Sequence, residues 1–424
     1  MAASNKKLIE FSFLSAFAQN FVSPLLSIYA LFLGATNQVI GALNAFPTFA
    51  SLVGQLLFVK ISKGLKFVIL GTIFWSFFWI FIGNIKEPLK LVELITAQAF
   101  ISAISTPAWN AFLVSYIPEK RRGVITAELN FFSSLGGFIS SLIGGYLINT
   151  FGFNPVFFYI TAFLGFISIL PLLKLKQGKI GSSKKIRTKV GDREKLISII
   201  VAVAFLNFSV TIAGPMMPIF LVKRLNASKF DIAILNAVAF IGSLLFLRPM
   251  GMLTDIVGRK KVMLASLLLI SLFPLPYFLA SKHSDINYII LYSFLGNIAW
   301  ASFNIASFSY LSDVATQPFE RSTTLYSFFT TLASFFGSLI SGVLAESLGY
   351  KNLFLLSLIL RVSSIFLFVK LKEAEEEKID VFILPFGYPL FENFVYVYSI
   401  AFRRVSEDIS KQISEFLKVL RRIR

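Results

Sequence analysis

The sequence predicts an all-α integral membrane protein with twelve transmembrane helices in two pseudo-symmetric six-helix bundles. The 424 residues are 56% hydrophobic and only 15% charged, and their mean hydropathy is +0.76. Soluble domains are about 45–50% apolar and about 25% charged. About twelve apolar runs have the length of about 20 residues that a helix needs to span the hydrocarbon core. The cations, which give a net charge of +18, cluster between these runs.

The apolar runs form two sets of six, and charged or Gly/Pro-rich turns separate them. The first six predicted helices cover residues 8–33, 38–59, 67–84, 91–117, 123–149 and 154–174. The second six cover residues 195–222, 229–250, 260–280, 287–312, 322–347 and 351–371. Residues 1–174 are therefore predicted to form an N-terminal bundle, and residues 195–372 a C-terminal bundle.

Residues 175–194 form a basic linker between the bundles, with glycines and serines among the cations. Its charge could suit nucleic acid, but a solvated cytoplasmic linker explains it better, and we expect no nucleic-acid partner. Cations are concentrated in the linker, in residues 6–7 and in every second loop, whereas the remaining loops carry few. The positive-inside rule therefore predicts a multi-pass plasma-membrane protein with both termini in the cytoplasm.

Residues 373–424 are predicted to be a cytoplasmic tail. An acidic run, residues 373–377, is followed by an apolar stretch that prolines and polar residues interrupt. One apolar face then recurs at helical spacing among cations, at Val405, Ile409, Ile413, Phe416, Leu417 and Leu420. This pattern predicts an amphipathic helix on the membrane surface, with lipid as its partner.

The two halves also show an internal repeat. A shift of 197 positions superposes Gly54 on Gly251, Ser115 on Ser312, Phe138 on Phe335, Gly145 on Gly342 and Gly152 on Gly349. Both halves thus begin on the same side of the membrane. Parallel repeats of this kind are related by an axis along the membrane normal, and a substrate site lies between them.

The most specific motif is the segment 251–261, GMLTDIVGRKK, which follows the eighth predicted helix as a short charged turn. It resembles the signature loop of the major facilitator superfamily, a family of transporters with two six-helix halves. The resemblance covers roughly residues 8–371. It implies that Gly251 permits close helix approach, that Asp255 contacts the start of the eleventh helix, and that Arg259, after Gly258, pairs with Asp313.

Two further cations belong to this predicted gating set. Arg321 ends the segment that follows Asp313, and Arg122 lies in the sister segment 117–123 of the first half. The first half lacks its own signature charges, because Phe58 and Ser62 occupy the positions of Asp255 and Arg259. The simpler alternative is that these loops only anchor the protein by the positive-inside rule.

Ionisable side chains within membrane helices are costly and usually functional. Glu128 in the fifth helix and Arg248 in the eighth are candidates for an ion pair that closes the cytoplasmic side. Glu128 could instead bond within its own half. Glu128 and Glu10 are also the candidates for proton coupling, although the position of Glu10 near a helix end fits the headgroup level as well.

Uncharged polar side chains in helices 1, 4, 7 and 10 are the candidates for a substrate cavity. They are Gln19, Asn20, Gln98, Asn110, Asn207, Asn297, Trp300 and Asn304. The last three repeat at helical spacing on one face. Amides and an indole among many phenylalanines suit a neutral or amphiphilic solute. Hydrogen bonds that only hold the bundle together are the alternative for any single residue.

These observations favour a secondary transporter that moves a small organic solute by alternating access. Within this class we expect an efflux antiporter for drug-like amphiphiles, with protons as a candidate coupling ion. Uptake of a sugar or similar metabolite would need more convergent polar groups, and a membrane sensor or scaffold is a further alternative. The chain has no Cys and one His, His283, in a predicted outer loop. No ATP-binding G-x-x-x-x-G-K-[ST] sequence occurs. We therefore expect no enzyme activity, no cofactor or metal, and a monomer.

Overall fold

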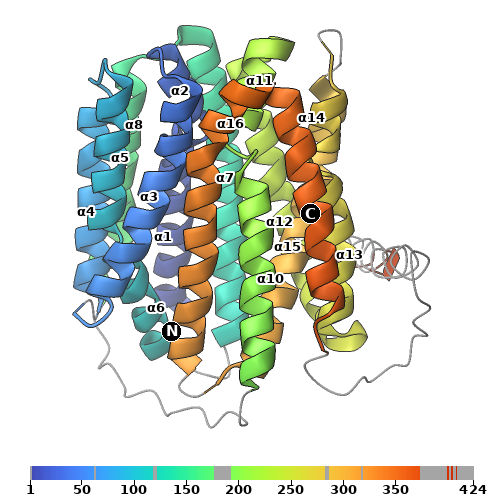
Figure 1. The fold of residues 1–424 in the computed structure, drawn as a ribbon. Helices are drawn as coiled ribbons and strands as arrows, with labels where there is room; N and C mark the ends of the chain where they lie inside the picture. The colour runs from blue at the N-terminus through green and yellow to red at the C-terminus, as the bar shows by residue number, and fades with distance from the viewer. Residues whose placement is uncertain are drawn as a thin grey trace, which may run out of the picture.

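The computed structural model describes residues 2–61, 64–117, 122–175, 192–281, 286–316 and 319–372, together with Ser399, Ile400, Arg403 and Glu407. Some side chains within these ranges, including those of Arg122, Arg248 and Asp255, are outside the description. All regular structure in the described ranges is helical (Figure 1). Eleven of these helices are long and apolar enough to cross a membrane.

The N-terminal half contains ten helical segments because several of its predicted helices are divided. In chain order they are α1 (Ala2–Asn20), η1 (Ser23–Leu25), α2 (Leu26–Phe32), α3 (Asn37–Phe58), α4 (Leu65–Ile82), α5 (Pro88–Ser102), α6 (Ser105–Tyr116), α7 (Arg122–Phe151), α8 (Pro155–Ser168) and α9 (Leu170–Leu173).

The C-terminal half begins after the predicted linker. Its segments are α10 (Arg193–Thr211), α11 (Met216–Leu225), α12 (Lys229–Val257), α13 (Arg259–Leu272), α14 (Leu275–Leu279), α15 (Ile286–Val314) and α16 (Phe319–Val369). Linker residues 176–191 and nearly all of the tail lie outside the described residues. The domain boundaries drawn from the sequence, and the surface helix of the tail, therefore stay predictions.

Prolines account for the division of the predicted helices. A proline inside a helix clashes with the carbonyl group four residues earlier and donates no hydrogen bond to it. Accordingly, α1 ends four residues before Pro24, and α10 ends four residues before Pro215. The break between α5 and α6 includes Ala103, four residues before Pro107. The sequence runs that look continuous in hydropathy are thus kinked spans.

The eleven candidate spans correspond to the twelve predicted helices. α16 is 51 residues long and contains Gly349 with φ 78° and ψ 160°, a non-helical conformation that divides it in two. These two parts are the predicted eleventh and twelfth helices. Gly152, 197 positions earlier, separates α7 from α8 with φ 73°. The predicted fold class is confirmed, and the repeat is visible in the backbone itself.

The signature segment differs from its prediction as a turn. α12 continues as helix to Val257, and only Gly258, with φ 105°, separates it from α13. The segment stays helical because Leu253 and Thr254 are buried against neighbouring helices, at 0% and 1% exposure. The corresponding glycine of the first half is Gly64, with φ 99°, 194 positions earlier. The first-half connection is therefore three residues longer.

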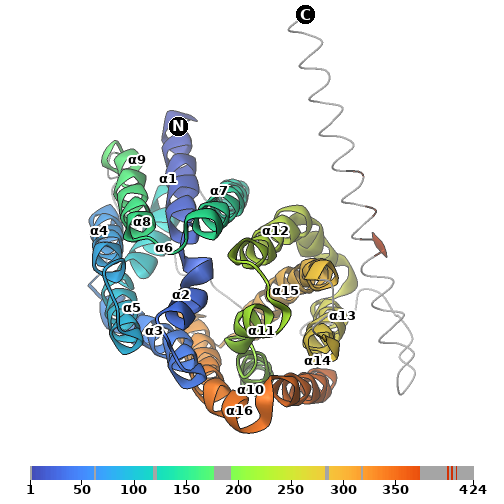
Figure 2. The same cartoon turned by 90° about the horizontal axis from the view of Figure 1, so that it is seen from above.

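The two halves lie side by side, and Figure 2 shows α7 facing α12 along one seam and α3 facing α16 along the other. We call the face with the start of α10 the linker face, at the bottom of Figure 1, and the opposite one the far face. The largest cluster of buried apolar residues includes both halves and lies toward the far face. Two smaller clusters belong to one half each, and both lie toward the linker face.

Candidate functional site

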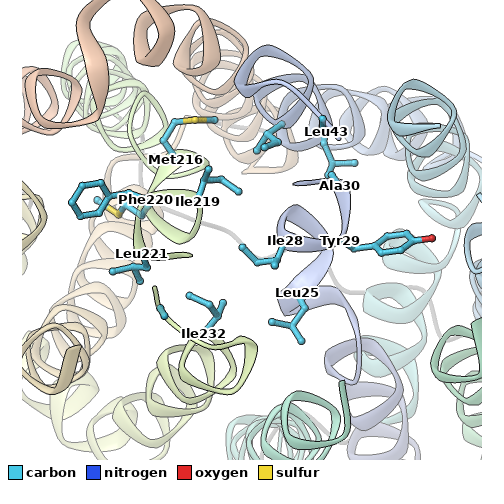
Figure 3. Packing of buried hydrophobic residues seen from close by; sticks show 14 of the residues in the cluster. Leu25, Ile28, Tyr29, Ala30, Leu43, Met216, Ile219, Phe220, Leu221 and Ile232 are labelled. Carbon is cyan, nitrogen blue, oxygen red and sulfur yellow. The ribbon is translucent and has the colours of Figure 1, made fainter. Parts of the chain in front are cut away.

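The far face is closed by apolar side chains from both halves. Leu25 and Ile28 of the first half face Met216 and Ile219 of α11, and Ile232 of α12 lies beside them (Figure 3). Each of these side chains is at most 5% exposed. The breaks before Leu25 and Met216 begin the short segments η1, α2 and α11, which carry most of these side chains. Together the side chains form a buried apolar layer that both halves share.

Two glycines of the repeat permit the close packing beneath this layer. A Cβ atom at Gly145 would collide with the side chain of Ala233 on α12. A Cβ atom at Gly342 would collide with the backbone of Asn37 at the start of α3. The two seams are thus equivalent by the repeat. At both, a helix of one half touches the backbone or Cβ atoms of the other.

Hydrogen bonds also join the halves toward the far face. The Gln38 side chain donates to the Glu346 carboxylate at 2.8 Å. The Tyr350 hydroxyl donates to the Asn37 side chain at 2.9 Å. On the other seam, Asn236 donates to the Ser141 hydroxyl at 2.8 Å. Among the described buried residues, the linker-face clusters contain none from the opposite half, so the described packing between the halves lies mainly toward the far face.

A pocket of about 460 Å³ lies between the halves. Asn297, Trp300 and Asn304 of α15 line it together, and Asn130 of α7 contributes from the other half. The predicted helical face of three polar residues therefore lines one pocket. Asn130 was missed by the sequence reasoning, although it is a polar residue in an apolar helix two positions after Glu128. The lining carries amide and indole groups and no charge.

A second pocket, of about 300 Å³, lies inside the N-terminal half and contains two of the predicted cavity residues, Gln19 and Gln98. Gln98 is only 5% exposed, and its amide nitrogen donates to the Trp75 carbonyl at 2.8 Å. Gln19 donates to the Ser15 hydroxyl at 3.0 Å. The predicted cavity set is thus divided between two separate pockets.

The other predicted cavity residues do not join these groups. Asn20 and Asn207 each donate to a carbonyl one turn earlier in their own helix, both at 2.9 Å. Asn110 is exposed on α6. Their amides mainly satisfy local backbone acceptors, which hydropathy and spacing do not distinguish from a ligand contact.

The candidate carboxylates for proton coupling are both exposed, Glu10 on α1 and Glu128 on α7. The Arg248 side chain lies outside the described residues, so its pairing with Glu128 stays a prediction. Within the described ranges, no three carboxylate or imidazole groups gather as a possible metal site.

At the linker face, Arg259 pairs with Asp313 at 2.9 Å, with side chains 19% and 23% exposed. Arg259 also reaches the Thr254 carbonyl at 3.5 Å. The implied ion pair is present, and it ties α12, α13 and α15 of one half to each other. The side chains of Asp255 and Arg122 lie outside the described residues, and Arg321 is exposed at the start of α16.

The implied role of Gly251 in close helix approach is not found. No described atom lies within 4 Å of a Cβ atom built on Gly251. Its repeat partner Gly54 is the tightly packed one, since a Cβ atom there would lie 2.6 Å from the Phe100 carbonyl oxygen. The glycine of the motif is kept in both halves, but among the described atoms a close contact is found only at Gly54 of the first half.

Arg361, in the second part of α16, is buried at 1% exposure inside the C-terminal half. Its guanidinium donates to the Ser357 hydroxyl at 3.1 Å, to the Ile270 carbonyl at 3.0 Å and to the Val210 carbonyl at 3.4 Å. Residue 274, four positions after Ile270, is a proline and cannot donate to that carbonyl, which accepts from the Phe273 amide at 3.3 Å instead. Arg361 therefore adds a second donor to an acceptor at a helix break.

Comparisons with known proteins agree with this architecture. Two uncharacterised MFS-type transporters of Methanocaldococcus jannaschii are 27% and 26% identical, over 78% and 83% of this chain and 86% and 93% of their own lengths. The multidrug resistance protein MdtG of Dickeya zeae is 22% identical over 81% of this chain and 88% of its own.

Among solved structures, a mutant of the nucleoside transporter NupG matches with a TM-score of 0.72, at 13% identity over 87% of this chain and 99% of that one. A bacterial homologue of the human lysosomal transporter Spinster matches with a TM-score of 0.68, at 16% identity over 86% and 95%. The family description Major Facilitator Superfamily matches residues 11–198 and again residues 197–406. The chain therefore belongs to the major facilitator superfamily of membrane transporters.

Proposed function

We propose that this transporter moves a small uncharged amphiphile out of the cell by alternating access, as a proton-driven antiporter. The observation that carries the proposal is the one-sided packing of the halves. They share an apolar cluster toward the far face, whereas the linker-face clusters are separate. Rocking of the halves about the pocket between them would exchange which face is closed.

The lining of the pocket between the halves supports an uncharged solute with an apolar part. Asn130, Asn297 and Asn304 can donate and accept hydrogen bonds, while Trp300 and Phe308 offer ring surface. A charged solute would meet no opposite charge among these lining residues. The name of the MdtG relatives, multidrug resistance protein, agrees with efflux of such compounds.

Glu128 is the first candidate for proton coupling, since Asn130, two positions along the same helix, lines the pocket. Glu10 is the second. We further propose a plasma-membrane monomer with both termini and the linker face in the cytoplasm, which the distribution of cations supports. In this orientation the cytoplasmic side is the open one, and Arg259, Asp313, Arg321, Arg122 and Arg248 are the proposed gating residues that act on its closure.

The test is flux in proteoliposomes with a panel of fluorescent amphiphiles and labelled sugars, with and without a pH gradient. We expect amphiphile flux that follows the gradient. Asn304→Leu and Trp300→Ala should lower the rate about tenfold, the effect of about 1.4 kcal/mol of lost binding. Glu128→Gln should abolish the response to the gradient.

Glu87→Gln is the matched control, because Glu87 lies at the far face and pairs only with Lys90 of its own helix end at 2.9 Å among the described contacts. Loss of the pH response in Glu10→Gln alone would move proton coupling to Glu10. Flux of sugars only, insensitive to pH and to both pocket variants, would contradict the proposed function.

A further inference from the structure

The polar pocket inside the N-terminal half is a candidate site of its own. It lies among α1, α3, α4, α5, α6 and α8, all of one half, and does not include any residue of the C-terminal half. Its polar lining is dominated by hydroxyl and amide groups, among them Ser15, Gln19, Ser51, Thr72, Gln98 and Ser102. Convergent polar groups of this kind are what a binding site for a hydrophilic solute requires.

Gln98 has its amide nitrogen bonded to the protein, which leaves its amide oxygen as the atom that could accept from a ligand. The bond from its amide nitrogen to the Trp75 carbonyl fixes the side chain in an environment that leaves it 5% exposed. Within the described ranges its amide oxygen accepts no hydrogen bond, and it is not among the buried atoms cut off from solvent. Gln19 and Thr106 at the same pocket are exposed, so the pocket borders the surface.

The internal repeat shows what occupies the same place in the other half. Arg361 corresponds to Leu164, 197 positions earlier, and Ile270 corresponds to Ser76 when Gly64 is matched to Gly258. Leu164 adjoins the lining residue Gly165, and Ser76 follows the lining residue Trp75. In the C-terminal half, the Arg361 guanidinium fills this region with its own donors. Among the described residues of the N-terminal half, no cation lines the corresponding region, and a pocket remains.

The chemistry of the lining selects the ligand. None of its residues is charged, so an ion would lose its hydration without compensation. The Thr72, Ser105 and Ser168 hydroxyls donate to carbonyls three or four residues earlier and can accept from a ligand, and the Gln98 oxygen can accept as well. Trp75 adds ring surface for the less polar face of a solute. A volume of about 300 Å³ is at the small end for ligand sites.

We propose that this pocket binds a compact, uncharged ring solute that carries several hydroxyl groups. The site goes beyond the proposed transport function, because it lies in one half and does not depend on which solute the pocket between the halves moves.

The experiment is equilibrium binding of labelled myo-inositol and labelled D-glucose to the purified full-length protein in detergent. Cyclohexanol, a ring of similar size with one hydroxyl, is the competitor. We expect saturable binding of at least one hydroxyl-rich ring and no competition by cyclohexanol. Thr72→Val and Gln98→Leu should each raise Kd about tenfold, the usual effect of one lost hydrogen bond in a binding site.

Thr48→Val is the matched control for Thr72→Val. Both hydroxyls donate to the carbonyl one turn earlier, at 2.8 Å and 2.9 Å, but Thr48 does not line the pocket. Its Kd should equal that of the unmodified protein. The proposal is overturned if neither ring binds saturably, if cyclohexanol competes equally, or if Thr72→Val leaves Kd unchanged. It is also overturned if Asn304→Leu weakens binding as strongly, since the solute would then lie between the halves.

Discussion

The two halves of this transporter share a backbone plan but differ in what fills their interiors. The C-terminal half holds Arg361 among carbonyl and hydroxyl acceptors, and it has the Arg259–Asp313 ion pair at the linker face. In the region that corresponds to Arg361, the N-terminal half has an uncharged pocket. With Gly64 matched to Gly258, its residues at the positions of Asp255 and Arg259 are Ile61 and Leu65.

The comparison teaches which features of a repeat are fixed by the backbone. Gly152 and Gly349 both have positive φ angles, which few other residues adopt. Gly145 and Gly342 both lie where a helix crosses the opposite half. These glycines are retained at equivalent positions in both halves, whereas the charged residues are found in the C-terminal half alone at the compared positions. One half is held by internal cation contacts, and the other leaves space for a ligand.

The largest expected effect is from Arg361→Leu. It removes three hydrogen bonds of the guanidinium, two of them to backbone carbonyls, and creates a void in the interior of the C-terminal half. We expect the free energy of unfolding in mixed detergent micelles to fall by about 3 kcal/mol. Leu164→Met at the repeat position should cost less than about 1.5 kcal/mol. Equal losses in the two variants would remove the proposed difference between the halves.

The seam glycines should respond alike. Gly145→Ala and Gly342→Ala each place a methyl group against the opposite half and should disfavour far-face closure by about 1–3 kcal/mol. Because the chain has no native Cys, the reactivity of a single cysteine introduced at Ile219 reports far-face opening directly. It should rise in both variants and stay unchanged in Gly251→Ala. A rise in only one seam variant would contradict the equivalence of the seams.

The smallest expected effect concerns the linker-face ion pair. Arg259→Gln and Asp313→Asn should each reduce the free energy of unfolding by about 1 kcal/mol, since the pair is partly exposed. A double-mutant cycle measures the coupling between them. The double variant should cost little more than either single variant. Additive losses would show that the two side chains act separately. The ion pair would then not be an energetic difference between the two halves.

The fold could be predicted well because lipid imposes helix length and apolar composition on every span. Hydropathy did not reveal the breaks, although Pro24, Pro107 and Pro215 carry the signal in a local form. The signature segment was predicted as a turn from its charges. Burial of Leu253 and Thr254, which depends on tertiary packing, keeps it helical.

The candidate site was predictable only in part. Helical spacing brought Asn297, Trp300 and Asn304 to one pocket. The spacing of residues along α15 does not indicate which residue of the N-terminal half lies opposite α15. Asn130 was missed for this reason. The division of Gln19 and Gln98 into a separate pocket depends on the packing of six segments. Arg361 was visible as a cation in a membrane helix, but its acceptors come from breaks in two distant helices.

The apolar seal at the far face determines the thermodynamic character of the transport cycle. When the face opens, Ile28, Ile219 and their neighbours pass from a dry layer to water. Exposure of apolar surface raises the heat capacity. A van't Hoff plot of the equilibrium constant for far-face opening should therefore be curved. Ionic strength changes it little, since screening acts on charges and the seal is made of hydrocarbon.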